Sequence, residues 1–145
     1  MILLEMVKTP MYLYLISHKK KDIKTHTYIG CTSDFIKRLS QHNGESPGGP
    51  RMTKRAAGHW QPVVILLLPE DRKFKSKDLK KEWKQSSRGL ESRIRKAFSL
   101  ALQHKLKVFL TTKNINNTQV LKYLKNKWKD DKLKLSASDW NNITN

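Results

Sequence analysis

The sequence predicts an α+β fold, in which a small and mostly antiparallel sheet is flanked by helices. Residues 11–16 and 26–30 are rich in aromatic and β-branched side chains, and the polar, lysine-rich loop between them suits two antiparallel strands. Residues 60–68 form a continuous apolar run bounded by Pro69, which is typical of a central strand. Elsewhere apolar residues recur at intervals of three and four, which indicates helices packed on the sheet.

The first predicted helix follows the second strand. Ser33 is a suitable N-cap, and Phe35, Leu39 and His42 recur at helical spacing until the Asn-Gly pair at 43–44 ends the pattern. This spacing predicts a short amphipathic helix.

A long loop is predicted between this helix and the central strand. Residues 44–58 are rich in glycine and proline and contain the basic residues Arg51, Lys54 and Arg55. Loops of this length are often functional, so we expect this one to contribute to a site.

The second half of the chain is predicted to add helices and one strand. Ser76 is expected to cap a helix that runs to about Gln85, residues 86–89 interrupt the pattern, and residues 105–112 are expected to form an edge strand. A second, longer helix is marked by Leu90, Ile94, Ala97, Phe98, Ala101 and Leu102. A last helix carries Val120, Leu121, Leu124 and Trp128 on one face.

One domain, 1–145, is expected from the chain length, with a core at about 11–85, a helical extension at about 86–130 and a frayed tail at 131–145. The last helix suits either of two roles. It packs on the core of its own chain, or it is a surface for self-association.

The charge of the chain indicates a polyanionic partner. Lys and Arg number 30 against 12 Asp and Glu, a formal net charge of +18, and self-repulsion of this size destabilises a protein unless a counter-charge relieves it. No segment reaches the roughly 20 apolar residues that span a bilayer, and the short apolar start, which contains Glu5, is not typical of a signal peptide. Nucleic acid is therefore favoured over membrane.

The single cysteine, Cys31, excludes an internal disulfide and a thiolate zinc cluster. Intracellular localisation, in the nucleus, the cytoplasm or a site of viral replication, is the corresponding expectation.

Several short motifs occur in order along the first 85 residues. They are Tyr12-Leu13-Tyr14, Tyr28-Ile29-Gly30, the segment 34–43 that ends in Gln-His-Asn, Gly48-Gly49-Pro50-Arg51-Met52-Thr53, Trp60, and the segment 79–85 that contains Glu82-Trp83. Together they resemble the GIY-YIG nuclease superfamily, nearest to the Slx-type structure-specific endonucleases and the UvrC-like nuclease domains. The resemblance covers roughly residues 11–85.

Two features depart from the family pattern. Tyr12 and Leu13 replace the glycine and isoleucine of the first signature, so only Tyr14 matches there by residue. The zinc domain that follows the nuclease in Slx-type enzymes is not expected in a chain with one cysteine, and neither is the scaffold partner that binds it.

The resemblance implies a metal-dependent endonuclease that hydrolyses phosphodiesters in flaps, forks and Holliday junctions during DNA repair, recombination or replication. Such hydrolysis requires an aligned water, neutralised phosphoryl charge and a stabilised leaving oxygen. Arg38 lies one helical turn before His42, and its planar guanidinium suits a phosphate. Tyr14, Tyr28 and His42 are the candidates for aligning or deprotonating the water, and the sequence leaves open which one does so.

The resemblance also implies that Glu82 is the ligand of a metal cofactor, Mg²⁺ or Mn²⁺. Glu91 is an alternative, although its position near the start of a helix favours an interaction with the helix dipole.

Binding to branched duplex DNA is expected to depend on the phosphate backbone, because the sequence contains no base-reading motif. The basic residues assigned to this role are Lys20, Arg51, Lys54, Arg55, Lys80, Lys81 and Arg88. A homodimer is compatible with this assignment. Two other functions remain open: a catalytically inactive nucleic-acid-binding module on the same fold, and a mobile-element or restriction-type nuclease.

Overall fold

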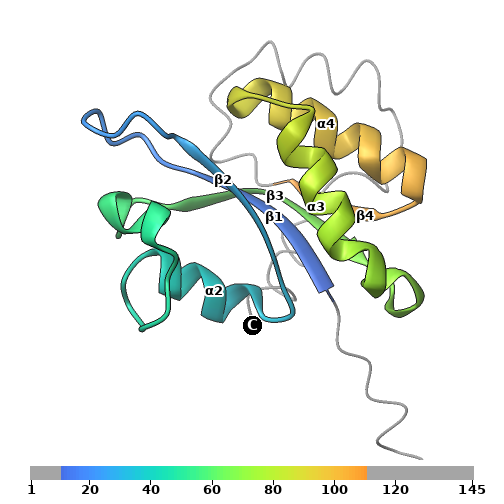
Figure 1. Cartoon of the computed structure of the whole chain (residues 1–145), viewed down its shortest axis with the longest axis horizontal. Helices are drawn as coiled ribbons and strands as arrows, with labels where there is room; N and C mark the ends of the chain where they lie inside the picture. The colour runs from blue at the N-terminus through green and yellow to red at the C-terminus, as the bar shows by residue number, and fades with distance from the viewer. Residues whose placement is uncertain (1–10, 111–145) are drawn as a thin grey trace, which may run out of the picture.

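The computed structural model describes residues 11–110, which form a four-stranded sheet with helices on both faces (Figure 1). The strands β1 (Met11–Ser17), β2 (Thr27–Thr32), β3 (Gln61–Leu68) and β4 (Lys107–Leu110) lie in the order β2-β1-β3-β4. Each neighbouring pair is antiparallel. The predicted α+β fold with a small antiparallel sheet is confirmed.

Two of the individual strand predictions are also confirmed. β3 lies inside the sheet between β1 and β4, as its continuous apolar sequence predicted. β4 falls within the predicted segment 105–112 and forms one edge of the sheet.

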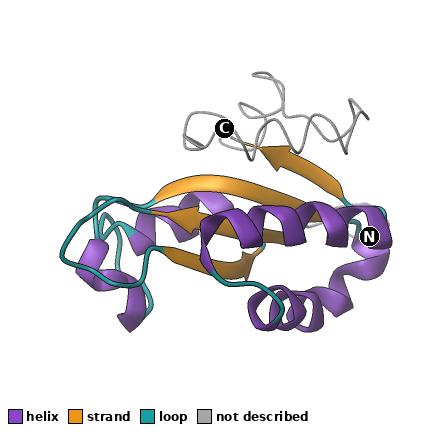
Figure 2. Ribbon diagram, turned by 90° about the horizontal axis from the view of Figure 1, so that it is seen from above, coloured by secondary structure: helices purple, strands orange, loops and turns teal. Residues whose placement is uncertain are grey.

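The two faces of the sheet carry different helices, because successive side chains of a strand point to opposite faces. Helices α3 (Ser76–Gln85) and α4 (Gly89–His104) cover one face, where Leu13 and Leu15 of β1 belong to the larger apolar core. Seen from above, this helical layer lies in front of the strands (Figure 2). Helix α2 (Phe35–His42) covers the other face, where Tyr14 and Ile16 belong to a smaller core cluster with Phe35.

The predicted caps of two helices are wrong. Asp34, not Ser33, caps α2, because its carboxylate accepts a hydrogen bond from the backbone N–H of Lys37 at 3.1 Å. Ser76 is the first residue of α3 instead of its cap, since the 3₁₀ helix η2 (Glu70–Lys75) runs directly into it.

The predicted loop at 44–58 contains a regular element, the 3₁₀ helix η1 (Arg51–Ala56). It begins after Pro50, whose fixed φ suits the residue before a helical turn. Thr53 and Ala56 point inward and are buried, so η1 closes over the same face of the sheet as α2.

Helix α4 confirms the predicted second helix, although one residue assigned to its apolar face lies elsewhere. Ile94 and Phe98 are buried in the larger core, whereas Leu102 is 48% exposed. The predicted last helix, the apolar start and the tail lie outside the described residues. Within residues 11–110, no helix is long and apolar enough to cross a membrane.

Candidate active site

Tyr14 lies at the centre of a cluster of rings between the sheet and α2. It is almost fully buried, and its hydroxyl lies 2.7 Å from Nε2 of His42, the last residue of α2. The rings of Tyr28, Phe35 and His42 lie within 6.3 Å of the Tyr14 ring, centroid to centroid. The fold therefore brings Tyr14, Tyr28 and His42 together from three separate elements.

The hydrogen bonds around His42 determine which of its nitrogens carries the proton. Nδ1 of His42 lies 3.0 Å from Oγ1 of Thr53, and that hydroxyl donates its one hydrogen to the carbonyl of Pro50. The Thr53 oxygen can therefore only accept from His42, which puts the proton on Nδ1. Nε2 is then an acceptor, so the Tyr14 hydroxyl donates to it. The result is a series of hydrogen bonds, each donated in the same direction, from the Tyr14 hydroxyl through His42 and Thr53 to the carbonyl of Pro50.

Burial keeps both partners of the Tyr14–His42 bond neutral. It raises the pKa of the Tyr14 phenol well above its ordinary value, and neighbouring Tyr28 adds to this effect, while Arg38 opposes it. Burial, with a further contribution from the charge of Arg38, lowers the pKa of His42 to about 4. Neither group is charged at neutral pH before an anion binds.

Arg38 projects from α2 beside these hydrogen-bonded residues. Its guanidinium is held in place by hydrogen bonds to two acceptors. Its Nη1 donates to Oε1 of Gln41 at 2.8 Å and to the carbonyl of Gly48 at 3.2 Å. The glycine pair approaches α2 closely, because a Cβ at Gly49 would overlap the carbonyl oxygen of Gln41. A guanidinium has five N–H donors, so fixing it through Nη1 leaves a directional group for a phosphate.

Asn43 fastens the loop that contains η1 at its base. Its Oδ1 accepts from the backbone N–H groups of Gly58 and Trp60, and its Nδ2 donates to the carbonyl of Trp60. The indole of Trp60 donates in turn to the carbonyl of Thr53 at 2.9 Å. These bonds hold Thr53 against His42.

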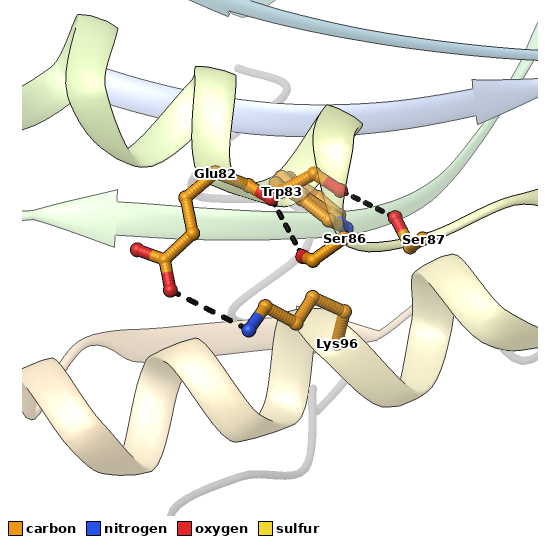
Figure 3. Close-up of polar contacts among 5 residues, drawn as sticks. All are labelled: Glu82, Trp83, Ser86, Ser87 and Lys96. Carbon is orange, nitrogen blue, oxygen red and sulfur yellow. Dashed lines mark hydrogen bonds and ion pairs between the residues drawn. The ribbon is translucent and has the colours of Figure 1, made fainter.

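Glu82 lies apart from the ring cluster. It belongs to α3, in the helical layer on the opposite face of the sheet from α2, and its side chain extends towards α4 (Figure 3). There its Oε1 lies 3.4 Å from Nζ of Lys96, with 43% of the Glu82 side chain exposed. The alternative carboxylate, Glu91, pairs with Arg95 one turn further along α4.

The residues fit a divalent cation through a single carboxylate. Within residues 11–110, no three His, Cys, Asp or Glu side chains form a cage for a metal. Mg²⁺ is commonly held by one or two carboxylates with waters and substrate phosphates, and an accessible carboxylate such as that of Glu82 meets this minimum.

The predicted DNA-binding residues lie in two regions. Lys20 donates to the carbonyl of Arg55 at 3.2 Å, which joins the loop between β1 and β2 to η1, where Arg51 and Lys54 also lie. The others, Lys80 and Lys81 on α3 and Arg88 at the start of α4, belong to the opposite helical layer.

Sequence reasoning missed the roles of Thr53 and Asn43. Both fall within the quoted motifs, but their function depends on contacts with residues 11 to 17 positions away. The available signal was only their place in the motifs, Asn43 at the end of the Gln-His-Asn segment and Thr53 at the end of the Gly-Gly-Pro-Arg-Met-Thr segment.

The fold and this site define a class of protein, and sequence comparison agrees with it. The sequence model of the GIY-YIG catalytic domain matches residues 10–91, more than half of the chain. The chain therefore belongs to the GIY-YIG family, and the predicted catalytic domain of that class is confirmed.

Three relatives carry the same kind of name. The chain is 33% identical over 89 residues to a structure-specific endonuclease subunit SLX1 homolog from Leishmania infantum, a match covering 61% of this chain and 12% of the relative. It is 40% identical over 70 residues to structure-specific endonuclease subunit slx1 from Aspergillus niger, a match that covers 48% of this chain and 16% of the relative. It is 36% identical over 77 residues to the Schizosaccharomyces pombe protein of the same name, a match that covers 53% of this chain and 27% of the relative. The chain thus spans only a small part of the length of these relatives.

Proposed function

We propose that this chain is a structure-selective DNA endonuclease that hydrolyses phosphodiesters in branched DNA. The observation that carries the proposal is the chain of hydrogen bonds from Tyr14 through His42 to Thr53, with Arg38 beside it. Membership of the GIY-YIG family and the names of the relatives support the same reaction class.

Tyr14 acts in this proposal as the group that takes a proton from the attacking water, which reaches the buried hydroxyl only when substrate binding rearranges the neighbouring side chains. The phenol oxygen accepts that proton while its own proton moves to Nε2 of His42. The imidazolium that forms keeps its Nδ1–H on Thr53, so His42 does not reorient during the transfer. The low pKa of His42 opposes this step until a phosphate binds, because an anion near Arg38 favours the charged imidazole.

Arg38 neutralises the charge that develops on the phosphoryl oxygens. Its fixed position, held by Gln41 and Gly48, lowers the reorganisation needed when substrate binds. A Mg²⁺ or Mn²⁺ ion would stabilise the leaving oxygen. Glu82 is the residue proposed to hold it, which requires its side chain to exchange the contact with Lys96 and to turn from α4 towards the phosphate beside Arg38.

The formal charge of +18 supports binding through the DNA backbone, independent of sequence. The basic residues on η1 and on α3 belong to different faces of the sheet, an arrangement that suits a substrate with more than one duplex arm.

The altered first signature, Tyr12-Leu13 in place of Gly-Ile, is the main argument for an inactive binding module. Tyr14 nevertheless keeps its place in β1 and its bond to His42, which favours the enzyme. A sequence-specific nuclease is less well supported, because none of the motifs described reads bases.

The test is cleavage of labelled flaps, forks, Holliday junctions and linear duplex by the purified chain, with Mg²⁺, with Mn²⁺ and with chelator. We expect nicking of the branched substrates that depends on metal, with little cleavage of linear duplex. Binding without cleavage of any substrate would support the inactive module instead.

A further inference from the structure

A cavity of about 410 Å³ opens beside the candidate active site, at the edge of β2. Its walls come from the segment that enters β2, from Met52 of η1, from Lys84 near the end of α3 and from the first turns of α4. The volume falls within the ~300–1,000 Å³ of sites that enclose small ligands. The cavity is therefore large enough for one small molecule or one unit of a polymer.

The polar part of the cavity is positively charged. Lys24, Lys84, Arg88 and Arg93 line it, and among the described residues no Asp or Glu does. Nη1 of Arg93 donates to Oγ1 of Thr27 at 2.9 Å, whereas its Nε is buried without a hydrogen-bond partner in the part of the chain described. These features favour an anion.

The apolar part of the cavity makes a simple anion site insufficient. Met52, which is 68% exposed, lines it together with Ile29 and Leu90. A large apolar side chain at the mouth of a basic cavity suits a ligand that has a flat apolar part as well as a negative charge. A nucleotide has both, as base and as phosphate.

Tyr28 connects the cavity to the candidate active site. It lines the cavity, and its ring centroid lies 4.8 Å from that of His42 and 6.3 Å from that of Tyr14. A ligand in the cavity is thus separated from the proposed proton acceptor by one aromatic ring.

We propose that this cavity binds a single unpaired nucleotide at the branch of the DNA substrate, with its base against Met52 and its phosphate on the basic residues. This rests on the proposed function and adds a means of selecting branched DNA. A nucleotide inside a duplex enters such a cavity only by leaving its stack, at a cost of a few kcal/mol, whereas an unpaired one does not. Stacking and backbone charge together are the usual basis of binding to single strands.

The charge part of the proposal is tested by binding of the full chain to a flap and to a linear duplex of equal length, in the absence of divalent metal. Lys84→Glu is expected to weaken binding to the flap about tenfold, by loss of a phosphate contact, and to change binding to the duplex by much less. Lys77→Glu, an exposed residue of the same helix outside the cavity, is the matched control and should affect both DNAs alike. Equal weakening of both DNAs by Lys84→Glu would overturn the proposal, and so would no weakening.

The base part is tested with a flap whose nucleotides next to the branch are abasic. The wild-type chain should bind it about fivefold more weakly than the normal flap, and Met52→Ala should bind the two equally. Equal binding of the two flaps by the wild-type chain would exclude a base in the cavity. Since these binding assays contain no metal, they test nucleotide binding in the cavity separately from cleavage. A chain that does not cleave DNA can therefore still confirm or exclude the binding proposal.

Discussion

Gly30 lies directly opposite Tyr14 in the pairing of β2 with β1, and the Tyr14 phenol fills the space where a side chain at position 30 would begin. A Cβ there would overlap the hydroxyl oxygen and the ring carbon that bears it. Gly30 is not one of the glycines with positive φ, so space for Tyr14 is what requires a glycine here.

Gly30→Ala is therefore expected to displace Tyr14 from His42 and to reduce cleavage at least tenfold, with a loss of stability of about 1–3 kcal/mol from overpacking. Single-turnover cleavage of a flap and thermal unfolding measure the two effects. Gly44→Ala is the control, because its Cβ would come no closer than 3.4 Å to another side chain although its φ of 74° is strained. It should lose stability but keep its cleavage rate, and full activity in Gly30→Ala would contradict the assignment of Tyr14.

Tyr14→Phe and His42→Gln are each expected to slow cleavage by about 10²-fold, because either one interrupts the same proton transfer. The double variant should be little slower than the slower single variant, as is found for residues that act as a unit. Tyr28→Phe keeps the aromatic ring, so its cleavage rate should fall by less than that of either variant. Rates that multiply in the double variant would show that Tyr14 and His42 act independently.

Arg38→Ala is expected to reduce cleavage by at least about 10²-fold with DNA affinity nearly unchanged, since the guanidinium acts on charge that develops in the transition state. Arg38→Lys should restore little, because an ammonium group cannot donate two parallel hydrogen bonds. The comparison requires rates at saturating DNA together with binding measured separately. A wild-type cleavage rate in Arg38→Lys would show that Arg38 acts only through its positive charge.

Glu82→Gln is expected to reduce cleavage by at least about 10²-fold if its carboxylate holds the metal. Lys96→Met should have the opposite effect on metal affinity and lower the Mg²⁺ concentration for half-maximal rate, because Lys96 competes for the same carboxylate. Metal titrations of both variants beside the wild type make the test. An unchanged Mg²⁺ requirement in both would assign the cation to other groups.

Acid is expected to destabilise the protein through His42. The pKa of this residue is about 4 in the folded chain against 6.5 for an ordinary histidine, so between these values the unfolded chain binds more protons. The free energy of unfolding therefore falls as pH decreases through this window, by at most about 3 kcal/mol from this group. His42→Gln lacks that component, so its stability difference from wild type should narrow between pH 7 and pH 4.5 in urea unfolding. A constant difference would argue against a buried neutral imidazole.

The fold could be predicted because its signals are local. The apolar run that became β3 and the three- and four-residue spacing in α4 depend on neighbours in sequence, and both were placed correctly. The cap of α2 was misassigned by one residue because Ser33 and Asp34 are both good caps, and only the backbone geometry distinguishes them.

The site could be predicted only as far as its motifs reached. Tyr14, Tyr28, Arg38 and His42 were named from the resemblance, and the first, second and fourth meet in one ring cluster. The position of Glu82 beside Lys96 depends on how α3 packs against α4, which no local pattern contains. The basic cavity was missed for the same reason, since Lys24 and Arg93 come from distant segments.

The three bonds of Asn43 make residues 44–59 a closed loop whose base is independent of its tip. The entropic cost of closing such a loop grows only with the logarithm of its length. A few residues inserted at the exposed Gly44–Glu45 end are therefore expected to change the free energy of folding by roughly a fraction of a kcal/mol. The separation of His42 from Thr53 is set by the base and by η1, so we expect it to persist where the inserted residues leave the contacts of Gly48 and Gly49 with α2 in place. Under that condition the loop is the place where an engineered tag or recognition peptide can enter the chain with little effect on the proton-transfer groups.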